Sequence, residues 1–212
     1  MMNRKLRPLL AGMLISASLS YIVCPSYAAT ADWQVQEVEE GSPVQVWTKE
    51  VQGSNFKAFR GSVEINAPLK SVLQTIHQTD KLPEWYHNTI EAKKLKSISE
   101  DESINYSVTH APWPVSNRDS VVHSTTKHQA DGSVLITLQA EPNAYPPQEG
   151  RIRISKLDGS WKLQPIDDNH TKVTLQIAAE PGGEIPSWLA NAMVVDMPFN
   201  TLNNLKQRLE KK

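Results

Sequence analysis

Cysteine is almost absent from this chain. The only one among 212 residues is Cys24, which lies in an apolar stretch near the start. The sequence also has no Gly-x-Ser-x-Gly elbow, His-Glu-x-x-His motif, phosphate loop or dinucleotide-binding fingerprint. Its six histidines show no close ligand spacing, and a structural zinc site without cysteines is improbable. We therefore expect no metal, no other cofactor and no disulfide.

The first 28 residues have the pattern of an export signal. Arg4, Lys5 and Arg7 form a positive end, and an apolar stretch follows over 9–23. Small residues in 26–28 predict cleavage after Ala28. The stretch is short for a membrane span, which needs about 20 residues. A retained amino-terminal anchor is the alternative.

Cleavage would leave residues 29–212, a length typical of one domain with a sizeable core. The signal holds three of the 22 basic residues and none of the 23 acidic ones, so the remainder has a net charge of −4. This balance argues against nucleic acid as a partner. Export without disulfides is typical of a bacterial periplasm. We expect a periplasmic or secreted monomer.

Alternation of apolar and polar residues, typical of strands, dominates the rest of the sequence. A helix is predicted over 69–78, with a turn or short helix over 81–86. The last helix begins near Pro186, and Pro198 should kink it. The predicted strands are 44–51, 56–65, 90–98, 103–110, 119–129, 133–141, 149–156, 160–166 and 171–180.

This order predicts an α+β fold in which a curved antiparallel sheet grips one long helix. A helix about 10 Å wide cannot fill a broad concave sheet, so we expect a cavity. Gly182 and Gly183 stand just before the last helix. Since glycine adopts backbone angles closed to other residues, we expect a hinge there, and alanine at both positions should slow exchange of a bound ligand.

Five segments, in order, resemble START domains, the lipid-transfer domains related to steroidogenic acute regulatory protein. The resemblance covers about residues 33–209, and it implies a helix-grip fold with an internal hydrophobic tunnel for one lipid, closed by the last helix. Segments 112–119 and 181–191 look most like the phosphatidylcholine-transfer branch. The segments are Trp47-Thr48-Lys49 with Gly53-Ser54 and Phe59-Arg60-Gly61; Pro112 to Asp119; Pro146-Pro147 with Gly150 to Arg153; Trp161 to Pro165; and Pro181 to Asn191.

One position departs from the sterol-type members of this family. Those members carry a basic residue six positions after the arginine of the Arg-Asp pair, facing an acidic residue in the tunnel. This chain has Ser124 there, six positions after Arg118.

Alternation along the strands gives the candidates for the concave face, because successive side chains point to opposite faces. Ordinary core is the alternative for each of them. Leu189, Met193 and Met197 lie one helical turn apart and should point inward, and methionine suits flexible acyl chains. The strand candidates are Ile104, Tyr106, Val108, Val122, Ser124, Val134, Ile136, Leu138, Val173, Leu175 and Ile177.

The charged and indole side chains leave more than one interpretation open. Arg118 and Asp119 should point to opposite faces, and Arg118 would contact a ligand headgroup, anchor a loop or form a structural salt bridge. Arg151 and Arg153 share one strand face, which we expect to be solvated. Trp113 and Trp188 would plug the tunnel mouth, insert into a membrane surface or simply pack.

The sequence thus predicts a lipid-binding protein that transfers or sequesters one phospholipid, sterol or other apolar molecule, with transient contact to a membrane surface. We expect no catalytic activity. An enzyme of cyclase or hydrolase type using the same cavity is the alternative, and a ligand-responsive interaction module is a third.

Overall fold

The computed structural model describes residues 33–211. The expected signal, its cleavage site and a possible anchor fall outside these residues. Within them, ten strands form a single sheet in the order β1-β2-β3-β10-β9-β7-β6-β5-β4, and β8 pairs with β6. The strands are β1 (Gln34–Gln36), β2 (Gln45–Lys49), β3 (Ala58–Ile65), β4 (Thr89–Ser97), β5 (Glu102–Thr109), β6 (Asn117–His128), β7 (Val134–Ala140), β8 (Arg151–Arg153), β9 (Lys156–Asp167) and β10 (His170–Glu180).

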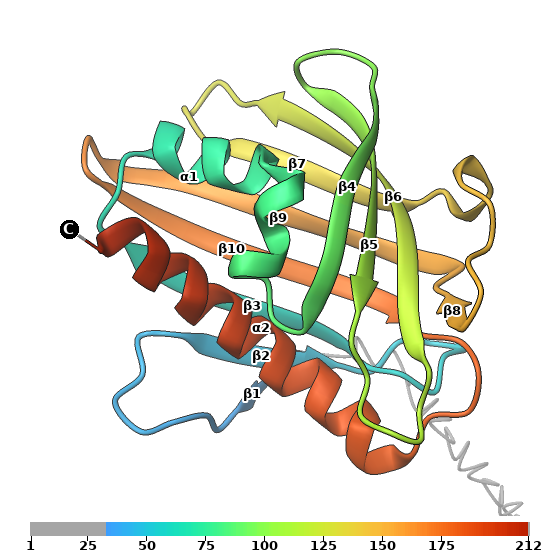
Figure 1. Ribbon diagram of the computed structural model, residues 1–212. Coiled ribbons are helices and arrows are strands. Elements are labelled where there is room, and N and C mark those ends of the chain that lie inside the picture. The colour runs from blue at the N-terminus through green and yellow to red at the C-terminus, as the bar shows by residue number, and fades with distance from the viewer. Residues whose placement is uncertain (1–32, 212) are drawn as a thin grey trace, which may run out of the picture. The chain divides into compact units, whose positions relative to one another are not determined.

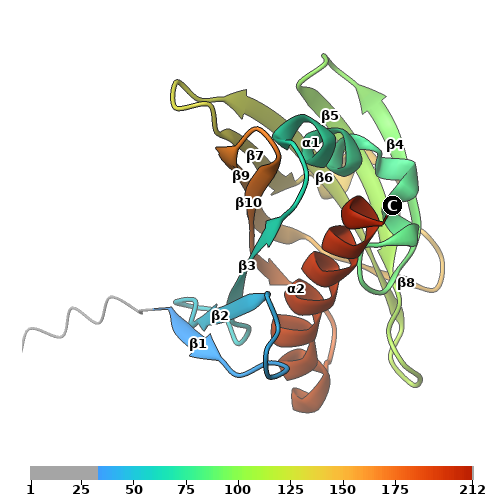
Figure 2. The ribbon, with the colours of Figure 1, turned by 90° about the vertical axis from the view of Figure 1, so that its left-hand side faces the viewer.

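Two α-helices and two short 3-10 helices complete this part of the chain: α1 (Leu69–His77), η1 (Thr79–Glu84), η2 (Pro142–Ala144) and α2 (Ser187–Glu210). Helix α2 lies across the concave face of the sheet, and the sheet curves around it (Figures 1 and 2). The predicted α+β helix-grip fold is confirmed.

Most strand boundaries agree with the prediction to within about two residues, but two regions differ. The strand expected over 149–156 is only β8, a three-residue segment that pairs in parallel with β6. The strand expected over 160–166 begins earlier, at Lys156, because β10 pairs with it along its whole length. The short edge strand β1 was not predicted.

Helix α2 packs closely on β3 at Gly61. A β-carbon there would lie 2.6 Å from Leu202 Cδ1 and 3.0 Å from Pro198 Cβ. Leu202 and Leu205 are fully buried in the main core beneath the sheet. The helix continues through Pro198, so the expected kink does not interrupt it. Only glycine at position 61 allows this helix to approach so near.

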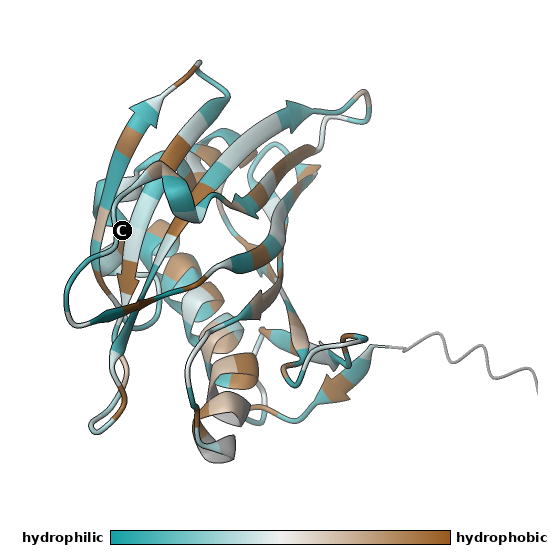
Figure 3. Ribbon diagram, turned by 90° about the vertical axis from the view of Figure 1, so that its right-hand side faces the viewer, coloured by the Kyte–Doolittle hydropathy of each residue, from teal (hydrophilic) through white to brown (hydrophobic). Residues whose placement is uncertain are grey.

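Hydrophobic and hydrophilic residues alternate along the strands, as a sheet with two different faces requires (Figure 3). Among the described residues, neither α-helix combines the length and hydropathy needed to cross a membrane.

Candidate functional site

A cavity of about 200 Å³ lies between the concave face of the sheet and α2; we call it the main cavity. Its apolar wall comes from β7, β9, β10, η1 and α2. An aromatic group forms part of that wall, with Trp85 and Tyr86 each 6.1–6.3 Å from Trp161 between ring centroids. The other apolar lining residues include Phe59, Leu82, Ile136, Leu138, Leu157, Ile177, Met193, Val194 and Met197.

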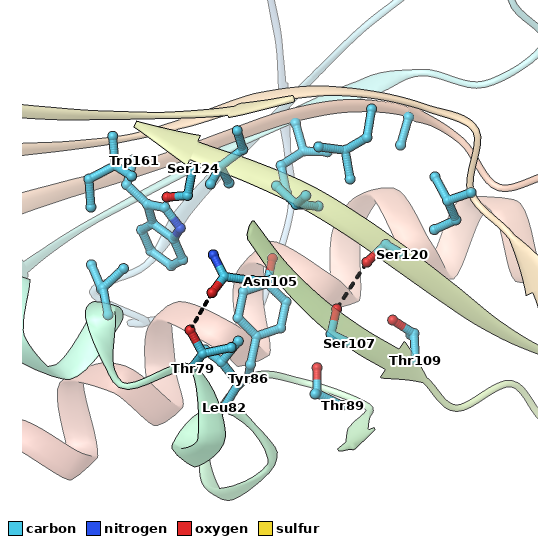
Figure 4. A pocket seen from close by; sticks show the side chains of 18 of the residues that line it. Thr79, Leu82, Tyr86, Thr89, Asn105, Ser107, Thr109, Ser120, Ser124 and Trp161 are labelled. Atoms are coloured by element: carbon cyan, nitrogen blue, oxygen red, sulfur yellow. Dashed lines mark hydrogen bonds between the residues drawn. The ribbon is translucent and has the colours of Figure 1, made fainter. Parts of the chain in front are cut away.

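Strands β5 and β6 give the main cavity a polar wall (Figure 4). Asn105 is bonded on both sides: Thr79 Oγ1 donates to its Oδ1 at 2.8 Å, and its Nδ2 donates to Ser103 Oγ at 3.0 Å. The hydroxyls of Ser107 and Ser120 lie 2.9 Å apart. The cavity is therefore amphipathic, because its apolar wall faces a row of uncharged side chains that form hydrogen bonds.

Titratable side chains also line the main cavity: Lys94, Glu100, Asp101 and Glu102 at or near the β4–β5 turn, and His77 and Tyr86 nearer α1 and η1. His77 Nε2 lies 3.0 Å from Thr126 Oγ1, and burial lowers the pKa of His77. Burial also raises the pKa of the Tyr86 phenol, which keeps it neutral. Among residues 33–211 there is no group of three His, Cys, Asp or Glu side chains suited to a metal ion.

A smaller hollow of about 80 Å³ lies beside the main cavity; we call it the side pocket. Its lining includes Arg118, Asn88 and Leu189. It is adjacent to the main cavity because both are lined by Thr109, Ile154, Met193 and Met197.

The structure places most of the predicted ligand-facing residues on the expected face. Val122, Ser124, Ile136, Leu138, Met193 and Met197 line the main cavity, and so does Ile177. Leu189 is buried and lines the side pocket. Ser124 lies opposite Ser103 in the β5–β6 register, so two uncharged hydroxyl side chains stand side by side on this face of the sheet.

On β5, Tyr106 lines the main cavity as predicted, but Val108 lines neither hollow. Val108 packs with Tyr106 and Val121 in a separate cluster. The Tyr106 ring packs against the tilted ring of Tyr145, with 5.0 Å between the centroids, and its hydroxyl accepts a hydrogen bond from Arg151. The segment around Tyr145 covers the outer side of β5. The alternating apolar residues of β5 therefore face that segment, and the polar residues between them face the cavity.

Leu175 lies on the concave face but within the solid core. It is fully buried, and its register partner is Gly61, on which α2 packs closely. Trp113 also lines neither hollow; its side chain is 91% exposed. The side chain of Trp188 lies outside the described part.

Arg118 and Asp119 point to opposite faces, as predicted. Asp119 is buried on the outer face and accepts a two-pronged ion pair from Arg153, at 2.9 and 2.8 Å. Arg151 pairs with Glu91 at 2.8 Å. The expectation of a solvated face for Arg151 and Arg153 was therefore wrong, because the buried carboxylate and Tyr106 give both arginines partners.

Arg118 is buried on the concave side and forms no salt bridge among the described residues, contrary to one of its interpretations. Its Nη1 donates to the Ser116 carbonyl at 2.6 Å and its Nη2 to the Gly182 carbonyl at 3.3 Å. It thus anchors the segment that leads into α2, and it also lines the side pocket.

Sequence reasoning missed the polar wall and the aromatic group, although a signal for the former was present. Ser103, Asn105, Ser107 and Thr109 alternate along β5, and polar residues at period two are as regular a pattern as the apolar ones between them. Their interpretation required knowing that the opposite face of β5 is also covered.

The sequence model described as "START domain" matches residues 27–212. The chain belongs to this family. It is 36% identical to a STAR-related lipid transfer protein from Xanthomonas axonopodis, whose crystal structure superposes with a TM-score of 0.77 over 84% of this chain and 99% of that one. Human StAR-related lipid transfer protein 5, 18% identical, shares the fold with a TM-score of 0.74 over 86% of this chain and 88% of that one.

Two curated relatives show how far the START similarity extends in sequence. An uncharacterised protein of Pseudomonas aeruginosa is 43% identical over 185 residues, which cover 87% of this chain and 90% of that protein. Mitochondrial steroidogenic acute regulatory protein of Equus caballus is 26% identical over 159 residues, covering 73% of this chain and 56% of that protein.

Proposed function

We propose that this protein binds one amphipathic lipid in the main cavity and carries it through an aqueous compartment, the periplasm if the amino-terminal segment is an export signal. The observation that carries the proposal is an amphipathic cavity between the sheet and α2 in a chain of the START family. The STAR-related lipid transfer protein of Xanthomonas axonopodis supports the lipid as ligand.

The physical benefit of such a cavity is the transfer of apolar surface out of water. Each buried methylene contributes about 0.8 kcal/mol, so a long acyl chain in water is disfavoured by on the order of 10 kcal/mol. The apolar wall, which includes Trp161, Ile136, Leu138 and Met193, would keep the acyl chain out of water while the lipid is carried. The uncharged hydroxyl and amide side chains of β5 and β6 can form hydrogen bonds with oxygen atoms of the lipid without burying a charge.

Uptake requires contact with a membrane surface, and the exposed Trp113 provides a means. The loop that carries it lies at the same end of the molecule as the start of α2 (Figures 1 and 2). Residues of that loop, Ala111 and Pro112, line the side pocket together with Leu189 of α2. Because tryptophan favours the membrane–water interface, insertion of Trp113 would bring the cavity to the bilayer.

A transfer assay between donor and acceptor vesicles tests this function. The protein should accelerate movement of a fluorescent phospholipid, and Trp113→Ala should slow transfer while leaving the amount of lipid bound at equilibrium unchanged. Ile166→Ala is the matched control, because Ile166 is 52% exposed and lines neither hollow.

No acceleration by the wild-type protein would contradict lipid transfer. Equal slowing by both variants would contradict the role of Trp113. Recovery of the lipid chemically unchanged separates carriage from the turnover that an enzyme would produce.

A further inference from the structure

Arg118 is the deepest charge in the side pocket. Its side chain is 2% exposed, and its Nε has no hydrogen-bond partner among the described residues. The two bonds it does form both go to neutral carbonyls, of Ser116 and Gly182. Burial lowers the pKa of this guanidinium, and no carboxylate within residues 33–211 pairs with it to oppose that effect.

A buried guanidinium without a counter-ion is energetically unfavourable, because it has lost water and gained no negative charge. The carbonyl groups compensate in part. An oxyanion would compensate far better, since charge-assisted hydrogen bonds to a guanidinium are stronger than those to neutral acceptors. The unpaired donor therefore points to an anionic ligand.

The other titratable groups of the side pocket do not supply that anion. Asp196 lines the pocket, but its side chain is exposed. The pKa of His87 is lowered by burial, and Asp196 opposes that shift. His110 is exposed. The interior of the side pocket therefore presents a fixed positive charge, with its carboxylate in contact with solvent.

Hydroxyl groups extend from the side pocket into the main cavity. Thr109 is the register partner of Arg118 on β5 and lines both hollows. Thr89, Ser107 and Ser120 lie close to it on the same side of the main cavity (Figure 4). The surface thus changes from a cation at Arg118, through hydroxyl groups, to apolar side chains at Trp161. This order matches the headgroup, the linker and the acyl chain of a lipid.

We propose that the side pocket binds the phosphate or carboxylate group of the same lipid whose acyl part occupies the main cavity, with Arg118 as the charged contact. This inference rests on the proposed function and narrows it to lipids that carry an oxyanion. It distinguishes them from neutral lipids such as diacylglycerols and sterols.

The test compares two lipids with identical acyl chains, a phosphatidate and a diacylglycerol, offered together from nonionic detergent micelles. Native mass spectrometry of the protein gives the ratio of the two complexes in one spectrum. We expect the phosphatidate complex to exceed the diacylglycerol complex by about tenfold or more, which corresponds to the low end of the coupling measured for close charge pairs at a protein interface.

Asn88→Asp places a carboxylate in the side pocket and leaves the Arg118 residue itself unsubstituted. Asn88 lines the pocket and has a φ of 56°, a conformation that aspartate also tolerates. This variant should lower the ratio about tenfold, because the new carboxylate repels the phosphate and competes for the guanidinium. Asn169→Asp, in an exposed turn remote from both hollows, makes the same change in net charge and should leave the ratio unchanged.

Equal binding of both lipids to the wild-type protein, or an unchanged ratio in Asn88→Asp, would overturn the headgroup site while leaving lipid binding intact. Binding of neither lipid would overturn the proposed function as well. Inorganic phosphate is the third probe: if it binds the wild-type protein while the phosphatidate does not, the pocket serves a soluble anion and the proposal is wrong.

Discussion

The guanidinium of Arg118 holds the backbone of Gly182, with 3.3 Å between Nη2 and the carbonyl oxygen. Gly182 and Gly183 have φ angles of 68° and 62°, in the left-handed region. A β-carbon at Gly183 would lie 2.9 Å from Ile152 Cδ1. The segment that leads into α2 is thus fixed by a hydrogen bond from the sheet and by angles that favour glycine.

Gly183→Ala should therefore strain the closed structure. A non-glycine residue in the left-handed region costs about 1–2 kcal/mol, and contact with Ile152 adds to that cost. We expect a lower free energy of unfolding in urea and faster exchange of a fluorescent lipid, because the closed state loses stability relative to an open one. The sequence alone suggested slower exchange; the observed angles favour the opposite sign.

Gly150→Ala is the matched control for this prediction. Gly150 has a φ of 72°, but nothing lies within 4 Å of the position a β-carbon would take. It should lose stability without any change in exchange rate. Slower exchange in Gly183→Ala would restore the interpretation of the glycines as a hinge that alanine stiffens.

Asp119 and Arg153 form a buried ion pair whose role is structural. Asp119 is 1% exposed, and Arg153 also donates to the Tyr145 carbonyl at 2.8 Å. Asp119→Asn should reduce the free energy of unfolding by about 3–5 kcal/mol, because it leaves a largely buried guanidinium without its counter-ion. Urea denaturation checks this.

The comparison variant is Glu180→Gln, which removes an ion pair between Glu180 and Lys156. Their side chains are 36% and 72% exposed, respectively. Exposed pairs contribute little, so its unfolding curve should be close to that of the wild type. If the two variants were equally stable, the outer-face ion pair would not be the structural element described above.

His77 makes stability depend on pH. Its pKa is lowered chiefly by burial, with Lys94 acting in the same direction and Asp101 against it. The unfolded chain therefore binds a proton at a higher pH than the folded one does. The stability contributed by neutral His77 is present above its usual pKa of about 6.5 and is lost as the pH falls through that value towards the folded pKa.

His77→Gln should reduce the loss of stability between about pH 7 and pH 5, and thermal unfolding across that range measures it. His110→Gln, at an exposed histidine, should keep the wild-type dependence. A dependence that is the same in all three proteins would show that His77 is not the group responsible.

The fold could be predicted from the sequence because it depends on patterns that each segment carries by itself. Period-two alternation identified most strands, and the apolar stripe beginning near Pro186 identified α2. The identity of the cavity face on β5 could not be predicted in this way. Neither alternation of that strand is exposed to solvent, and only the tertiary position of Tyr145 shows which one meets the cavity.

The partners of charged residues depended on tertiary contacts in the same way. Asp119 and Arg153 are 34 positions apart in the chain, and the bond between them exists because β8 pairs with β6. Arg118 and Gly182 are separated by 64 positions. No local pattern predicts such pairs. For that reason we expected Arg153 to be solvated, and the role of Arg118 had several interpretations.

The central claim is that a lipid occupies the space between the sheet and α2, and filling that space with a side chain tests it most directly. Leu138 lines the main cavity, whereas Leu135 lies on the same strand with its side chain on the other face. Leu138→Trp should remain folded and lose the lipid-sized mass that native mass spectrometry detects on the wild-type protein. Leu135→Trp should retain it. A wild-type protein that carries no lipid after incubation with vesicles, or a folded Leu138→Trp variant that binds as much lipid as Leu135→Trp, would contradict the account.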